Sequence, residues 1–118
     1  MKPALHRGLD ADRLRALLPA QLAALLPPTL PAGPPWALLL FPNTGRPVRS
    51  GAAARALARL PDLDGERLVV AAGSLTMEAG GLFRSRADLV LTKSDFFWTD
   101  ASYERIHQLV SAPRKNPP

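Results

Sequence analysis

The chain has 118 residues, of which 47% are hydrophobic, and its 15 basic against 10 acidic side chains give a formal net charge of +5. Folding a chain of this length removes roughly two thirds of its surface, so the composition excludes a disordered or fibrous protein and suits one folded domain. Because the sequence contains no cysteine, it excludes thiol nucleophiles, zinc–thiolate sites, iron–sulfur clusters and disulfides.

Leucines recur at helical spacing between residues 10 and 26, which predicts an amphipathic helix with Asp10 or Asp12 as its N-cap. Pro19 lies inside this segment, so we expect either a kinked helix or two short ones. Acidic side chains distinguish the segment from an export signal, and no apolar run approaches the ~20 residues of a membrane span. We therefore expect a cytoplasmic protein without membrane association, whose first residues, including His6, are frayed.

The middle of the chain begins with five prolines, which predict a stiff, extended connector over residues 27–35. The apolar run WALLLF over residues 36–41 is typical of a strand that is buried on both faces. Residues 42–45, PNTG, predict a turn. Residues 46–50 are then either a short return strand or the loop of a β-to-α crossover.

An alanine-rich helix is expected next, over residues 51–60, and Pro61 ends it. Ser50 is its expected N-cap. Arg55 and Arg59 lie one turn apart, on the face that we expect to be exposed to solvent.

Two further apolar runs predict two more strands, over residues 68–72 and 88–92. The segment between them decides the fold. A crossover helix there would contain Gly80-Gly81, at a cost of about 1 kcal/mol for each glycine. We therefore expect a two-residue Gly-Gly turn that joins antiparallel strands over residues 75–79 and 82–85.

A last helix is expected from Thr99 or Asp100 to about Val110, followed by a disordered tail over residues 114–118. Together these elements predict a single α+β domain over residues 1–118, in which three helices cover a mixed or mostly antiparallel sheet. The alternative is a small α/β three-layer sandwich in which the three apolar strands are parallel neighbours.

The predicted order of helix, strand, short strand, helix, three strands and helix resembles that of the roadblock family, dynein-light-chain-like modules with a profilin-like fold. The segment WALLLFPNTGRPVRSG, residues 36–51, is similar to the opening hairpin of the family, with a polar-Gly turn followed directly by the middle helix. The resemblance implies a non-enzymatic homodimer that docks small GTPases or their regulators. The family has no invariant functional residue that could be assigned to a position in this sequence.

The first candidate site is the segment that leads into the middle helix. Free backbone N–H groups and the dipole of a helix N-terminus attract an anion, and the segment brings two arginines to the same place. A phosphate or an acidic side chain of a partner would bind there. In the simpler alternative, the serine only caps the helix and the arginines are solvated. The candidate anion- or partner-binding residues are Arg46, Arg49, Ser50, Arg55 and Arg59.

The second candidate site interleaves aromatic and basic side chains, a combination that binds single-stranded nucleic acid because bases stack on rings while cations neutralise phosphate. However, the excess of 12 Arg over 3 Lys is typical of a bacterial genome of high GC content. Three successive aromatic residues more often form a core plug or a dimer surface. This set comprises Arg84, Arg86, Lys93, Phe96, Phe97 and Trp98.

The sequence offers no catalytic or metal-binding set. His6 and His107 are the only histidines, neither belongs to a recognisable motif, and the carboxylates lack the spacing of metal ligands. We expect no cofactor. The sequence favours a non-catalytic protein-interaction or regulatory module that forms a homodimer and binds an unidentified protein partner. The alternative is a nucleic-acid-binding protein that uses the arginines and the aromatic cluster.

Overall fold

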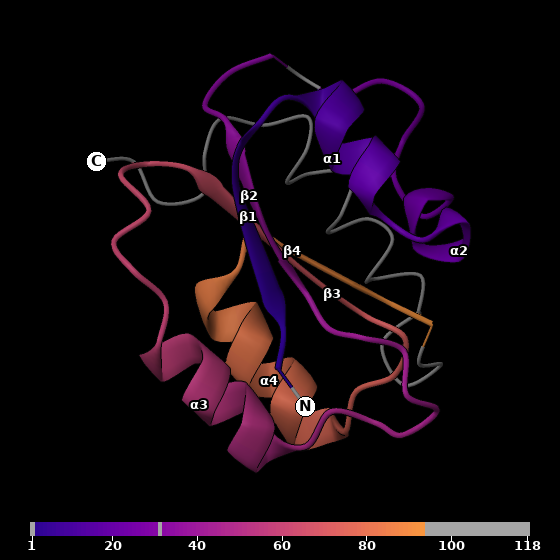
Figure 1. Ribbon diagram of the computed structural model, residues 1–118, viewed down its shortest axis with the longest axis vertical. Helices are drawn as coiled ribbons and strands as arrows, with labels where there is room; N and C mark the ends of the chain where they lie inside the picture. The colour runs from indigo at the N-terminus through magenta and orange to yellow at the C-terminus, as the bar shows by residue number, and fades with distance from the viewer. Residues whose placement is uncertain (1, 31, 94–118) are drawn as a thin grey trace.

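The computed structural model describes residues 2–30 and 32–93, which form a four-stranded sheet between two layers of helices (Figure 1). Strand β1 is antiparallel to β2, whereas β2, β3 and β4 are parallel to one another. The predicted mixed sheet is therefore confirmed, and its three apolar strands are parallel neighbours, as in the alternative arrangement. In their spatial order the strands are β1 (Ala4–Leu9), β2 (Trp36–Leu40), β3 (Arg67–Ala72) and β4 (Leu89–Thr92).

The described residues contain four helices, one more than we expected for the whole chain: α1 (Ala11–Leu17), α2 (Ala20–Ala23), α3 (Ser50–Ala58) and α4 (Met77–Arg86). Helix α3 connects β2 to β3, and α4 connects β3 to β4. Both crossovers step in the same direction across the sheet, so right-handed connections place both helices on one face. Helices α1 and α2, which connect β1 to β2, cover the other face (Figure 1).

Each face of the sheet has its own apolar core. The alternation of side chains along β2 sends Leu39 toward α3 and α4 and Leu38 toward α1 and α2. On the first face Phe83 is fully buried, and its ring centroid lies 5.6 Å from that of Phe41. Because both faces are covered, the central strands are continuous apolar runs, as the sequence indicated.

The predicted hairpin around Gly80-Gly81 is wrong, because this segment is helix α4. The side chain of Thr76 caps the helix by accepting a hydrogen bond from the backbone N–H of Ala79 at 3.2 Å. Gly80 lies on the buried face of α4, and α4 packs against α3. The cap and the burial of Phe83 offset the roughly 1 kcal/mol that each glycine costs.

The N-terminal residues also differ from expectation, because residues 4–9 are not frayed but form β1. Asp10 is the N-cap of α1, as predicted, and accepts a hydrogen bond from the backbone N–H of Arg13 at 2.8 Å. Pro19 separates α1 from α2, so the alternative of two short helices is confirmed. The observed order of elements therefore differs at β1 and at α4 from the order on which the roadblock resemblance rested.

Residues 46–49 belong to the loop of a β-to-α crossover and do not form a return strand. Within this loop Val48 forms an isolated parallel bridge with Leu75. Ser50 is the first residue of α3 and not its cap, because the N-cap position belongs to Arg49. The helix itself is the one that the alanine-rich segment predicted.

The described part of the proline-rich connector packs on the rest of the molecule. Leu30 is buried, and the guanidinium of Arg67 donates to the carbonyl of Pro34 through Nε at 3.0 Å and Nη2 at 2.6 Å. The same guanidinium lies 3.7 Å from the ring centroid of Trp36, a cation–π contact. Burial lowers the pKa of Arg67, and the charge of Asp88 partly opposes this effect.

The expected C-terminal features lie outside the described residues: the aromatic cluster, the last helix and the tail over residues 114–118. Over residues 2–30 and 32–93, no helix is long and apolar enough to cross a bilayer.

Candidate functional site

The three parallel strands end at one edge of the sheet, which we call the carboxyl edge, and begin at the other, the amino edge. Open sheets of parallel strands bind ligands outside the carboxyl ends of their strands. Helices α3 and α4 begin at this edge, and the loops that lead to them are joined by two hydrogen bonds. The N–H of Val48 donates to the carbonyl of Ser74 at 3.0 Å, and the N–H of Thr76 donates to the carbonyl of Val48 at 3.0 Å.

The two helices differ in whether a side chain accepts a hydrogen bond from the backbone N–H groups of the first turn. Thr76 caps α4, whereas the N-cap residue of α3, Arg49, makes no side-chain cap hydrogen bond. The first turn of α3 also contains no acidic side chain. The positive end of the α3 dipole therefore has no acidic or capping side chain in the first turn, which favours an anion beside it.

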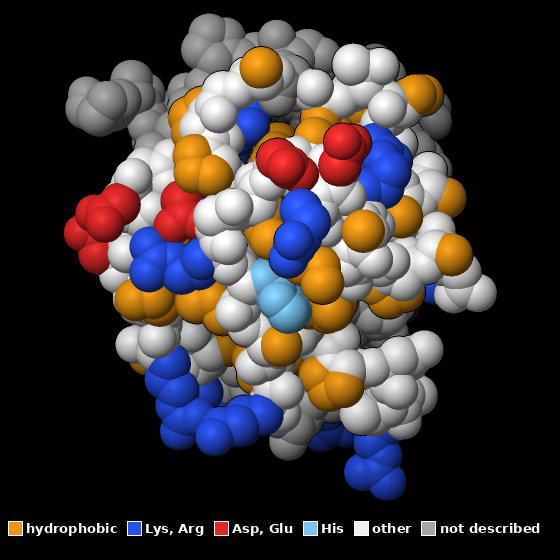
Figure 2. Space-filling model, turned by 45° about the horizontal axis from the view of Figure 1, so that its top comes forward, with side chains coloured by type: hydrophobic (Ala, Val, Ile, Leu, Met, Phe, Trp, Pro, Cys, Tyr) orange, Lys and Arg blue, Asp and Glu red, His pale blue; other side chains and the backbone are white. Residues whose placement is uncertain are grey.

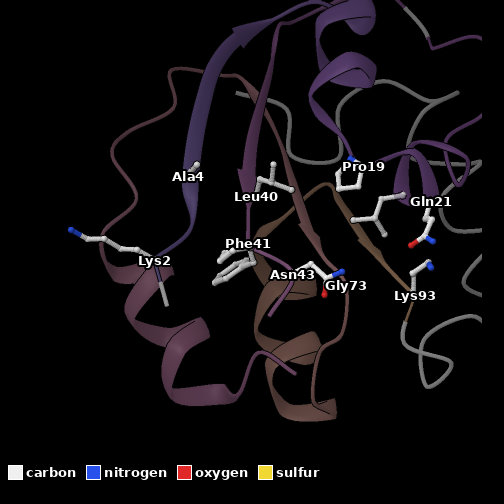
Figure 3. A pocket seen from close by; sticks show the side chains of 11 residues that line it. Lys2, Ala4, Pro19, Gln21, Leu40, Phe41, Asn43, Gly73 and Lys93 are labelled. Carbon is white, nitrogen blue, oxygen red and sulfur yellow. The ribbon is translucent and has the colours of Figure 1, made fainter. Parts of the chain in front are cut away.

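A pocket of about 320 Å³, which we call the carboxyl-edge pocket, opens between β1, α2 and the ends of the parallel strands (Figure 3). Its walls are mostly apolar and include Leu22, Leu40 and Phe41. In Figure 3 the side chains of Gln21 and Lys93 lie on one side of the pocket, whereas Asn43 and Lys2 lie elsewhere along its wall. The pocket can hold a small ligand with an apolar body and one polar or anionic end.

A second hollow, which we call the basic hollow, lies between β1 and α3 and has a volume of about 190 Å³. Three cations line it, Lys2, Arg55 and Arg59, over an apolar floor of leucine and alanine side chains that includes Leu5. None of its lining residues is acidic. Nη1 of Arg55 lies 3.9 Å from the point where a Cβ on Gly51 would stand, so this guanidinium reaches back over the first turn of α3.

Acidic side chains gather away from this hollow. In Figure 2 they occupy only the upper half of the visible face, with basic side chains beside them. At the lower end of this face, all of the charged side chains are basic. Among the described acids, only Glu78 lies at the carboxyl edge, in the first turn of α4. The others follow β1, lie in α1 or precede β3 and β4: Asp10, Asp12, Asp62, Asp64, Glu66 and Asp88.

One of these acids holds β1 in place from the amino edge. The Glu66 carboxylate accepts hydrogen bonds from Nε and Nη2 of Arg7 at 2.9 and 2.7 Å and from the backbone N–H of Gly8 at 2.8 Å. The N–H of Gly8, helped by the Arg7 guanidinium, lowers the pKa of Glu66 against the opposing effect of burial. Sequence reasoning missed this pair because it assigned no strand before residue 10.

The predicted anion-binding residues lie along α3 and the loop before it, and two of them, Arg55 and Arg59, line the same hollow. Arg46 and Arg49 lie in the loop before α3 and are exposed, and Arg55 and Arg59 lie on the exposed face of the helix. Ser50 is exposed at the first helical position. Lys2 belongs to the same surface, and only the missed strand β1 explains its position there.

The predicted aromatic–basic set does not form one surface in the described residues. Arg84 and Arg86 lie in the last turn of α4, before β4, whereas Lys93 follows β4 at the carboxyl edge. The four residues of β4 separate them by roughly 13 Å along the strand. Its other members, Phe96, Phe97 and Trp98, lie outside the described residues.

No group of three metal-ligating side chains occurs within the described ranges. Asp62, Asp64 and Glu66, which alternate in the sequence, do not form such a group. Asp62 Oδ1 instead accepts a hydrogen bond from the N–H of Asp64 at 3.1 Å within the turn, and Glu66 is bound to Arg7. His6 is half-buried on β1.

Comparison with protein-family models, with curated proteins and with solved structures finds no match to this chain. The two hollows are therefore the features of the molecule from which a function can be inferred.

Proposed function

We propose that this protein is a non-catalytic interaction module that docks an acidic protein partner on the surface around α3. We define this basic surface as Lys2, Arg46, Arg49, Arg55 and Arg59. The observation that carries the proposal is the basic hollow, which gathers three of these cations over an apolar floor without an acidic side chain in its lining.

Two arginines of α3 repel each other, although both lie near the C-terminal end of the helix, where its dipole favours cations. Arg55 and Arg59 lie four residues apart, and like charges at this spacing destabilise a helix by roughly 0.2–0.5 kcal/mol. An acidic partner would remove this repulsion and would supply the acceptor that the first turn of α3 lacks. Opposite charges across an interface also steer association and exclude wrong partners.

The lining of the basic hollow favours a protein partner over a nucleic acid. Single-stranded nucleic acid gains much of its affinity from bases that stack on aromatic rings. The hollow contains no aromatic side chain, and its floor is built from aliphatic side chains such as Leu5 and Leu60, which suit an apolar side chain of a protein. Nucleic-acid binding remains the rival function, because the same cations would also contact phosphates.

Fluorescence anisotropy with two labelled probes separates these functions: an acidic peptide that contains leucine, and a single-stranded thymidine oligonucleotide. The test variant is Arg55→Gln/Arg59→Gln. The matched control is Arg13→Gln/Arg86→Gln, which removes the same charge from exposed sites on other helices. We expect the test variant to weaken peptide binding about tenfold and the control to change it less than about twofold. Equal losses in both variants, or tighter binding of the oligonucleotide, would contradict the proposal.

Self-association is part of the same proposal, with a second copy of the chain as a further partner. It rests on the apolar cluster Phe96-Phe97-Trp98, which lies outside the described residues. Sedimentation equilibrium of the full chain at several concentrations tests it, and Trp98→Ala should shift the equilibrium toward monomer. A monomer at every concentration would remove this part of the proposal.

The carboxyl-edge pocket favours a second candidate function, the binding of a small ligand with an apolar body and an anionic end. The apolar walls would hold the body, and Lys93 would face the charge. Titration with hexanoate, followed by the backbone amide shifts of Gln21, Leu40 and Lys93, tests this function, with hexanol as the uncharged control. Shifts that are equal for both compounds would show that the lysine does not select an anion.

A further inference from the structure

Strand β1 is an edge strand, and Figure 1 shows it at the outer side of β2. It pairs with β2 on one side, and no described strand pairs with its other side. An edge strand presents backbone N–H and C=O groups that can bind an added strand. The question is which groups of β1 are directed outward.

The hydrogen bonds between β2 and β3 fix the alternation along β2. The N–H of Phe41 donates to the carbonyl of Ala71, and the N–H of Arg67 donates to the carbonyl of Pro35, both at 2.9 Å. Successive residues of a strand direct their backbone groups to opposite sides. The odd-numbered residues of β2 therefore face β3, and the even-numbered residues face β1.

The register of β1 then identifies its outward residue. Leu40 pairs with Ala4, and Leu38 pairs with His6, so these two residues of β1 direct their backbone groups toward β2. Leu5 lies between them and directs its N–H and C=O toward the free edge. The side chain of the same residue forms part of the floor of the basic hollow.

The basic hollow runs along this edge. Strand β1 and helix α3 both run antiparallel to β2, so the cations of α3 are arrayed along the direction of β1. Lys2 precedes β1 at the carboxyl edge, and Arg59 follows the nine residues of α3, which span about 13 Å, so the cations of the hollow extend over about that length. A strand of five residues spans the same ~13 Å, and its first, third and fifth side chains share one face. An added strand with acidic side chains at its two ends and an apolar side chain at its centre would therefore match the cations and the apolar floor of the basic hollow.

We propose that the acidic partner binds as an extended segment that adds a strand to the free edge of β1 and places alternate side chains over the basic hollow. This inference rests on the proposed function and names the form of its partner. A second copy of β1 suits the edge less well, because pairing two copies would bring the cations of both hollows, Lys2, Arg55 and Arg59, into one interface. Like charges placed opposite each other are destabilising, whereas an acidic strand neutralises them.

The test uses the full chain and the acetylated, amidated peptide Glu-Thr-Leu-Thr-Glu, in which the acidic and apolar residues share one face. Two further peptides carry backbone N-methyl groups, one on both threonines and the other on the leucine and the second glutamate. Both modified peptides keep the charge of the parent. Only one of the two sets of N–H groups can face β1 in a given pairing, so each modified peptide serves as the control for the other. Binding is followed by calorimetry and by the hydrogen exchange of the Leu5 amide.

We expect one N-methylated peptide to bind about tenfold or more weakly than the parent, the other to stay within about threefold of it, and the Leu5 amide to exchange more slowly in the complex. If neither or both of the modified peptides lose affinity, strand addition is refuted, although charge-driven docking survives. If the parent peptide does not bind, the proposed function fails as well. A dimer of the free chain that the parent peptide does not dissociate would assign the edge to a second copy and overturn the inference.

Discussion

Replacing Glu66 with glutamine should loosen the attachment of β1, the strand on which the basic hollow depends. The wild-type carboxylate accepts three hydrogen bonds, two from Arg7 and one from the backbone N–H of Gly8. A glutamine carbonyl can keep one or two of these bonds but loses the charge. Hydrogen bonds to charged groups contribute about 1.5–3 kcal/mol, and the side chain of Arg7 is 40% exposed, so solvent screens part of this contribution. We expect a loss of about 1–2 kcal/mol at pH 7.

The lowered pKa of Glu66 determines how the stability difference between wild type and variant changes with pH. Because the pKa of Glu66 is lowered by folding, the carboxylate contributes stability at pH values above the ordinary glutamate pKa, and this contribution is lost as the pH falls through the lowered pKa of the folded state. Urea denaturation of wild type and Glu66→Gln at pH 7 and at successively lower pH values measures the difference. The difference in the free energy of unfolding should shrink toward acid. A variant as stable as wild type at pH 7, or a difference that does not change with pH, would refute the reasoning.

Two further substitutions test the architecture. Gly81→Ala should raise the free energy of unfolding by about 0.5–1 kcal/mol in thermal or urea denaturation. Gly81 is exposed within α4, and a Cβ there would have nothing within 4 Å. A loss of stability would instead favour a turn at this position. Arg67→Lys should lower the free energy of unfolding by about 1–3 kcal/mol in the same assay. A lysine cannot reproduce both the paired hydrogen bonds to Pro34 and the stacking on Trp36. An unchanged denaturation midpoint would contradict a structural role for this guanidinium.

The mixed sheet and its apolar strands could be predicted because strands buried on both faces are continuous apolar runs, as in WALLLF. Helix α4 could not, because the energetic cost of Gly80-Gly81 is visible in the sequence whereas the packing of α4 against α3 is not. Strand β1 was missed for a related reason. Its residues include only two leucines, Leu5 and Leu9, and their burial depends on pairing with β2 rather than on a local pattern.

The candidate site could be predicted only where its residues are close in sequence, and not where long-range contacts bring them together. Arg46, Arg49, Arg55 and Arg59 lie close together in sequence, so local spacing placed them around one helix. Lys2 joins them only through the pairing of β1 with β2, which is a long-range contact. The carboxyl-edge pocket likewise combines residues from separate elements, and no single segment of the sequence indicates it.

Mapping the backbone amide shifts of the full chain during titration with the parent peptide Glu-Thr-Leu-Thr-Glu tests directly whether the basic surface docks an acidic partner. We expect the largest shifts at Leu5, Ala52, Arg55 and Arg59, which line the basic hollow, and negligible shifts in β4, on the opposite side of the sheet from β1, for example at Val90. Added salt should reduce the shifts, because exposed charges are screened beyond about 10 Å at 0.1 M ionic strength. Shifts spread evenly over the basic residues of α1 and α4, or no shifts at all, would contradict the proposed docking site.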